Sequence, residues 1–92
     1  LTLLLADAPG EPERALPMAR GAAGWFERFV PGACAGARYR YDVGGGLRVP
    51  DPASRFQPDD CHGPREVVDP RAYRWRAGAW AGRPWHEAVV YE

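Results

Sequence analysis

Residues 37–50, ARYRYDVGGGLRVP, decide the fold of this 92-residue chain. Charged and apolar side chains alternate in the first half of the stretch, in the order Arg38, Tyr39, Arg40, Tyr41, Asp42 and Val43. A period of two is typical of a strand with one apolar and one polar face. Three glycines at 44–46 then lead directly into a second short run. Short glycine-rich connections favour hairpins, so we predict two paired strands at 37–43 and 47–50.

Apolar runs separated by turn residues flank this hairpin on both sides. The runs occupy residues 1–6, 14–19, 25–30, 65–69 and 86–92. Clusters of Pro, Gly and Asp divide them at intervals of roughly 8 to 12 residues, and no run has a convincing helical period. The pattern predicts an all-β, antiparallel sandwich.

Composition limits the chain to one small domain and excludes some partners. Apolar residues make up 46% of the sequence, with 4 Trp, 4 Tyr and 3 Phe, which is enough for one aromatic-rich core. All 12 cations are arginines and 12 acidic residues balance them, so we expect no nucleic-acid partner. No apolar run reaches the roughly 20 residues that a membrane span needs, so we expect no membrane partner.

The cysteines and histidines do not form a metal-binding pattern. Cys34 and Cys61 stand apart without a CxxC pair, and His62 and His86 are the only histidines. We therefore expect no metal, two ordinary thiols and a reducing, cytoplasmic location.

The sequence contains no self-contained active site. Most carboxylates stand in turn clusters, where they cap backbone groups, rather than as a pair that flanks a cleft. Ser54 is the only serine and lacks a Gly-x-Ser-x-Gly elbow. A Cys61–His62 pair is a weak nucleophile and base, because adjacent residues of an extended chain point apart. We expect no catalytic residue and no cofactor in this chain.

The aromatic residues leave two interpretations open. Trp75 and Trp80 lie among Gly, Ala and Arg, where an exposed indole face can stack on a sugar ring. Aromatic residues of a small domain also supply its core and its contact with a neighbouring domain, which is the more common role.

The proline-rich segment 49–70 is predicted to be an ordered loop rather than a tether. Each X-Pro pair holds the preceding residue extended. Phe56, Val67 and Val68 supply apolar groups that we expect to anchor the loop by burial. We expect the charged side chains to remain free for a neighbouring domain, namely Arg55, Asp59, Asp60 and Arg65.

These segments together resemble a known family. The motifs VPDPASRFQP at 49–58 and HGPREVVDP at 62–70, with GWFE at 24–27, RYRY at 38–41 and GRPWHEAVVYE at 82–92, closely resemble the N-terminal module of the maltooligosyltrehalose trehalohydrolases. This family belongs to the α-amylase superfamily. The resemblance extends from about Trp25 to Glu92, and only loosely covers the first 24 residues. The motifs at 49–70 separate it from the related branching and debranching enzymes.

The resemblance implies a fold and an activity. It implies an immunoglobulin-like, early-set β-sandwich over residues 1–85, with residues 86–92 leading into a (β/α)-barrel that begins at a segment like Val89–Glu92. The enzyme hydrolyses the α-1,4 bond that releases trehalose from maltooligosyltrehalose, and its catalytic carboxylates lie in the barrel. Arg55, Phe56, Trp85 and Tyr91 are then expected to contact the barrel. An autonomous α-glucan-binding module that uses Trp75 and Trp80 remains the alternative.

The start of the chain departs from the family pattern. The family usually has a further strand upstream of the run at 1–6, and this sequence lacks it. We therefore expect Leu1–Ala6 to be an exposed strand edge through which the chain self-associates.

Overall fold

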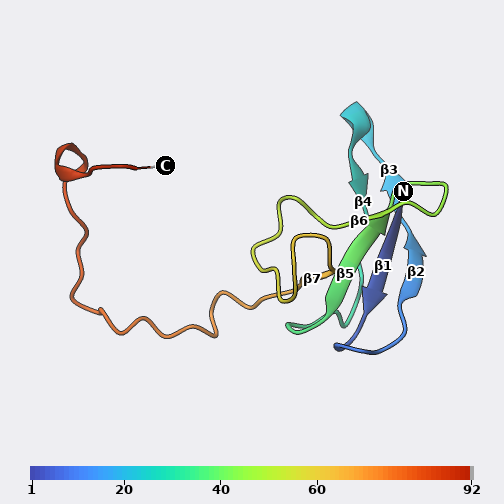
Figure 1. The fold of residues 1–92 in the computed structure, drawn as a ribbon, viewed down its shortest axis with the longest axis horizontal. Coiled ribbons are helices and arrows are strands. Elements are labelled where there is room, and N and C mark those ends of the chain that lie inside the picture. Colours follow the sequence, from blue (N-terminus) through green and yellow to red (C-terminus); the bar gives the residue numbers. More distant parts are fainter. Residues whose placement is uncertain (92) are drawn as a thin grey trace.

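The central strand of the structure is the first one in the sequence. In the computed structural model, which describes residues 1–91, β1 (Thr2–Ala6) pairs with β2 (Arg14–Pro17) on one side and β5 (Arg38–Asp42) on the other. Both pairings are antiparallel (Figure 1). The prediction that Leu1–Ala6 is an exposed edge is therefore wrong. The backbone groups of β1 have partners on both sides within the chain, so β1 is not an open edge of the sheet; self-association of the chain stays a prediction.

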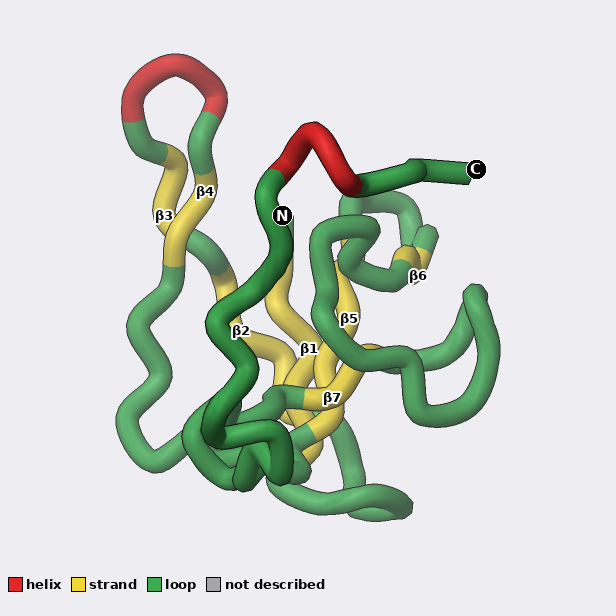
Figure 2. The backbone as a smooth tube through the Cα atoms, turned by 90° about the vertical axis from the view of Figure 1, so that its left-hand side faces the viewer, coloured by secondary structure: helices red, strands yellow, loops and turns green. Residues whose placement is uncertain are grey.

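Short strands complete an all-β architecture, as predicted. β6 (Arg48–Val49) and β7 (Arg65–Glu66) pair with opposite ends of β5 and complete a five-stranded sheet of order β2-β1-β5-β6. β3 (Ala19–Arg20) and β4 (Phe26–Glu27) form a separate hairpin that carries the 3-10 turn η1 (Ala22–Gly24) between its strands (Figure 2). The sheet and the hairpin are consistent with a β-sandwich.

The alternation in residues 38–42 gives the sheet two chemically different faces. Tyr41 lies opposite Leu3 and Tyr39 opposite Leu5, which makes one face apolar. Arg40 lies opposite Leu4 and Arg38 opposite Ala6, so arginine side chains cross the other face. Leu4, Leu5, Ala6 and Ala37 are the buried apolar residues.

The charged face carries a ladder of ion pairs above β1. Glu13 Oε1 lies 2.7 Å from Arg40 Nε, and its Oε2 lies 3.6 Å from Arg48 Nη1. Arg38 Nε lies 3.0 Å from Glu66 Oε2 and its Nη1 lies 3.1 Å from Asp59 Oδ2. The two Nε contacts are ion pairs whose angles fall outside hydrogen-bond geometry. Leu4 and Ala6, which lie opposite these arginines in β5, are buried.

The chain leaves the sheet after Val67 and forms an extended tail (Figure 1). The only regular element in residues 69–91 is the 3-10 turn η2 (Trp85–Glu87), and every residue of that range is exposed. The predicted strand at 86–92 is thus not formed in residues 86–91, and Glu92 lies outside the described residues. A strand needs a neighbour for its backbone hydrogen bonds, and this run lies away from the sheet. The predicted domain boundary at residue 85 stays a prediction.

Candidate functional site

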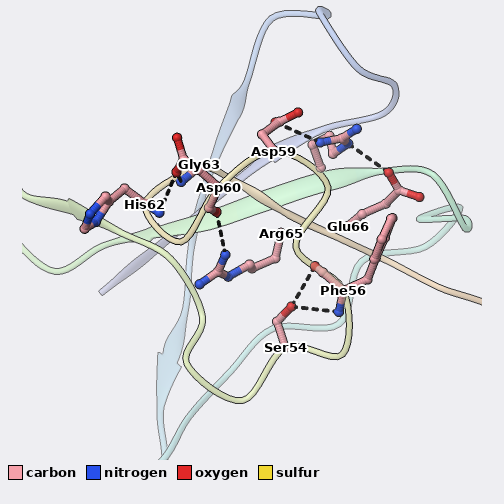
Figure 3. A network of polar contacts seen from close by, with 9 residues as sticks. Ser54, Phe56, Asp59, Asp60, His62, Gly63, Arg65 and Glu66 are labelled. Carbon is pink, nitrogen blue, oxygen red and sulfur yellow. Dashed lines mark hydrogen bonds and ion pairs between the residues drawn. The ribbon is translucent and has the colours of Figure 1, made fainter.

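A single arginine organises the proline-rich segment at 49–70. Arg65 is only 4% exposed, although it is charged. Its Nε donates a hydrogen bond to the Asp51 carbonyl oxygen at 3.2 Å, its Nη1 to that of Asp60 at 3.1 Å and its Nη2 to that of Cys61 at 3.1 Å. These carbonyls come from both ends of the loop, and Figure 3 shows the guanidinium inside it. The fork geometry of arginine suits this task, since one side chain satisfies three acceptors at once.

Short side chains fix the remaining turns of the loop (Figure 3). The Asp60 carboxylate accepts hydrogen bonds from the backbone N–H groups of His62 at 2.6 Å and Gly63 at 2.8 Å. These bonds hold the pKa of Asp60 below its ordinary value. The Ser54 hydroxyl donates to the Phe56 carbonyl and accepts from the Phe56 N–H. The segment is therefore an ordered loop.

The loop is anchored differently from the sequence prediction. Phe56 is 44% exposed and Val68 is also exposed, so neither anchors the segment by burial, whereas Val67 is half-buried. Arg65 is buried, so the prediction that it is free to meet a neighbouring domain is wrong: the loop curls around its guanidinium. Asp59, which pairs with Arg38, and Asp60 are exposed, and their contact with a neighbouring domain stays a prediction. Arg55 remains exposed, as a contact residue must be.

A second polar link joins the loop to the sheet. The Tyr39 hydroxyl donates to Asp51 Oδ2 at 2.9 Å. Burial, reinforced by this hydrogen bond and by the Asp51 charge, raises the pKa of Tyr39 to about 12. Burial likewise raises the pKa of Tyr41, whose ring packs edge-on against that of Tyr39. The loop is thereby fixed on the apolar face of the sheet.

That apolar face is only partly covered. A groove of about 340 Å³ runs over it and is open to solvent. Its floor is formed by Leu3, Leu5, Tyr39 and Tyr41, and its walls by Met18, Arg28, Val30, Ala33 and Val67. In a complete sandwich this face is the one that a second layer covers.

The tail carries five of the eleven aromatic residues, including three of the four tryptophans. Trp75 is 81% exposed, Trp80 68%, Trp85 81% and Tyr91 97%. Tyr73 stacks edge-on against Trp75 with ring centroids 5.0 Å apart. Trp25 is exposed as well, beside the β3–β4 hairpin. The two proposed glycan-stacking residues and two of the proposed interdomain residues are thus all accessible in this chain.

Other chemical groups are dispersed over the surface. Residues 1–91 contain no group of three or more His, Cys, Asp or Glu side chains that could hold a metal ion. Cys34 and Cys61 are free and exposed. No helix within residues 1–91 is long and apolar enough to cross a membrane.

Sequence comparison identifies relatives of this chain. Over 70 residues it is 34% identical to the malto-oligosyltrehalose trehalohydrolase of Rhizobium sp. (strain M-11), a match that spans 75% of the chain and 12% of the relative. Over 57 residues it is 44% identical to the enzyme of Deinococcus radiodurans, across 62% of the chain and 9% of the relative. Over 75 residues it is 40% identical to that of Saccharolobus solfataricus, across 82% of the chain and 13% of the relative.

These matches confirm the resemblance predicted from the motifs. They also show that the chain spans only about a tenth of the length of each relative. No family model matches the chain, and no solved structure matches it.

Proposed function

We propose that this chain, which is homologous to about a tenth of each malto-oligosyltrehalose trehalohydrolase, is a non-catalytic N-terminal module of such an enzyme. The intact enzyme would hydrolyse the α-1,4 bond that releases trehalose from maltooligosyltrehalose, in the cytoplasm and without a cofactor. The catalytic carboxylates belong to a (β/α)-barrel elsewhere in that polypeptide. The module supports the barrel by packing against it.

The exposure of the aromatic side chains carries this proposal. An isolated domain of this size needs its large aromatic residues for its own core, yet Trp75, Trp85 and Tyr91 are all more than four-fifths exposed. Exposed aromatic residues in such number are typical of a surface that another protein covers. The remaining nine-tenths or so of each relative's length leaves room for such a neighbour, which we take to be the barrel.

The same proposal accounts for the finer features of the fold. We assign the sheet to an immunoglobulin-like, early-set sandwich whose open groove is closed in the intact enzyme. The apolar run 88–91 is proposed to become the first barrel strand once barrel neighbours provide its hydrogen-bond partners. Arg55 and Phe56 on the loop, with Trp85 and Tyr91 on the tail, form the proposed interdomain contact.

A chimeric enzyme tests the proposal. The segment of the Deinococcus radiodurans enzyme that matches this chain is replaced by this chain, and a matched variant lacks the segment altogether. We expect the chimera to release trehalose from maltotriosyltrehalose and the deletion variant to lose activity through instability. A chimera no more active than the deletion variant, or trehalose release by the 92-residue chain alone, would overturn the proposal.

Glycan binding by the module itself is the second candidate. The observation in its favour is that the indole faces of Trp75 and Trp80 are accessible. Titration of the chain with maltoheptaose, followed by tryptophan fluorescence, tests it. Saturable quenching that Trp80→Ala abolishes and Trp25→Ala preserves would support it, because Trp25 is equally exposed but lies beside the hairpin. An unchanged signal at millimolar sugar would exclude it.

A further inference from the structure

Charge is segregated along a chain that is neutral as a whole. Residues 1–69 hold eight arginines and ten carboxylates, a net charge of −2. Residues 70–91 hold four arginines and one carboxylate and have a net charge of +3. The charged residues of this range are Arg71, Arg74, Arg76, Arg83 and Glu87. The overall balance therefore conceals a basic tail on a weakly acidic body.

The arginines of the two parts have different surroundings. Five of the eight body arginines are engaged: Arg14, Arg38, Arg40 and Arg48 form ion pairs with body carboxylates, and Arg65 is buried on carbonyl groups. The other three, Arg20, Arg28 and Arg55, form no ion pair with a described carboxylate. In the tail, Arg83 pairs with Glu87 four residues later at 2.9 Å. No carboxylate among residues 1–91 pairs with Arg71, Arg74 or Arg76. Within residues 1–91 these three guanidinium groups therefore have no carboxylate partner, and they neighbour exposed aromatic residues in the sequence.

The body of this chain is not the surface that these groups match. Glu13, Asp59 and Glu66 on the charged face are already engaged by arginines of the sheet. The tail runs away from the sheet (Figure 1). Trp75 and Trp80, which neighbour these arginines in the sequence, are exposed. No ion pair joins a tail arginine to a body carboxylate within residues 1–91, so another surface is left as the complement of the tail.

We propose that residues 71–85, the docking arm, bind an acidic surface with apolar recesses on the remainder of the same enzyme polypeptide. This inference rests on the proposed function and names the chemistry of the module's partner surface. Burying the arm's indole rings brings three guanidinium groups to the interface. Desolvating a guanidinium without a counter-charge is strongly unfavourable, so carboxylates must meet them.

Two features favour a protein surface over a membrane or a nucleic acid. Gly78, Gly82 and Pro84 interrupt the arm, and residues 71–84 form no helix, so the arm lacks the amphipathic helix that lies in a lipid interface. The net negative body would also be repelled by any extended polyanion that the arm approached. A folded acidic surface of limited extent avoids both difficulties.

The test measures binding of the 92-residue chain to the Deinococcus radiodurans enzyme that lacks its own matching segment. Tryptophan fluorescence and calorimetry follow binding at 0.1 and 1 M NaCl, where the screening length falls from about 10 to about 3 Å. We expect the Kd to rise roughly tenfold between these salt concentrations. If apolar contacts alone held the arm, the Kd would stay constant or fall as the salt concentration rises.

Single charge reversals give the decisive comparison. Arg74→Glu and Arg76→Glu are each expected to raise the Kd at 0.1 M NaCl by roughly tenfold. Arg20→Glu is the matched control, since Arg20 is an exposed arginine of β3 outside the arm, and it should leave the Kd unchanged.

The outcomes separate this inference from the proposed function. Binding that neither salt nor the arm reversals alter would overturn the acidic surface and leave the module assignment standing. If the truncated enzyme does not fold, the chimera described above replaces it, with tryptic cleavage after Arg71, Arg74 and Arg76 as the readout. Cleavage that is slow at 0.1 M and fast at 1 M NaCl supports the proposal, and equal rates overturn it. Tighter binding to phosphatidylserine vesicles than to the enzyme would also overturn it.

Discussion

Removing the Arg65 guanidinium should collapse the loop at 49–64 and much of the stability of the chain. Arg65→Met keeps the length and the apolar stem of the side chain but leaves the carbonyl oxygens of Asp51, Asp60 and Cys61 without their donors. Hydrogen bonds to a charged group contribute about 1.5–3 kcal/mol each. Three of them give about 5–9 kcal/mol before the desolvation of the buried charge is subtracted.

The net loss in the free energy of unfolding is smaller, and it can be compared with the total free energy of unfolding expected for the chain. Desolvating a guanidinium costs several kcal/mol, so we expect Arg65→Met to lower the free energy of unfolding by about 3 kcal/mol. A chain of this size has about 5–14 kcal/mol in all, and the short strands place this one near the lower end. Arg65→Lys keeps the charge but lacks the fork, so we expect a loss of about 2 kcal/mol.

Urea unfolding followed by far-ultraviolet circular dichroism is the appropriate assay. Tryptophan fluorescence is a poor reporter here, because all four indoles are well exposed in the folded chain. Arg55→Met is the matched control, since Arg55 lies in the same loop but is exposed, and it should change stability by less than about 0.5 kcal/mol. A loss below about 1 kcal/mol for Arg65→Met, or equal stability of Arg65→Lys and the unaltered chain, would refute the role of the fork.

Four further predictions concern the sheet and its turns. Tyr39 should titrate near pH 12 by ultraviolet absorbance; since the folded form holds its proton more tightly than the unfolded form, stability is retained below pH 10 and lost as pH rises to about 12. Asp51→Asn should lower the pKa of Tyr39 only in part, because burial is the larger cause; a return to the ordinary value would contradict this. Glu13→Gln should cost about 1 kcal/mol in urea unfolding, as it uncouples two arginines, whereas exposed Glu11→Gln should cost almost nothing. Gly44→Ala should cost about 1 kcal/mol or more, because φ is +116° there, and an unchanged midpoint would refute the strain.

The sheet could be predicted from the sequence wherever one face is apolar. The strict alternation at 38–42 specified both the strand and its faces, because a shift of one residue would bury the arginines and expose the tyrosines. The run at 1–6 was equally clear as a strand. The position of this strand in the sheet could not be predicted, because an apolar run indicates burial but does not indicate which strands pair with it on either side.

The site was harder to predict for a physical reason. Arg65 precedes Glu66 in a short strand and has the same sequence signature as any surface arginine; its role depends on carbonyl groups up to fourteen residues away. The residue pattern does not indicate which backbone carbonyl groups will accept hydrogen bonds, so the sequence favoured Phe56 as the anchor of the loop. The tail shows the opposite difficulty. Its aromatic residues suggested ordered structure, but the partner that would order them is not encoded in these residues.

The central position of β1 has a consequence for synthesis on the ribosome. β1 is synthesised before the strands that flank it, and β5, its partner on one side, ends only at Asp42. Until that residue has emerged, the leucines of β1 have only the hairpin with β2 to shield them. At typical elongation rates of about 5–20 residues per second, this interval lasts a few seconds. During this interval the leucines of β1 are open to chaperones and to aggregation.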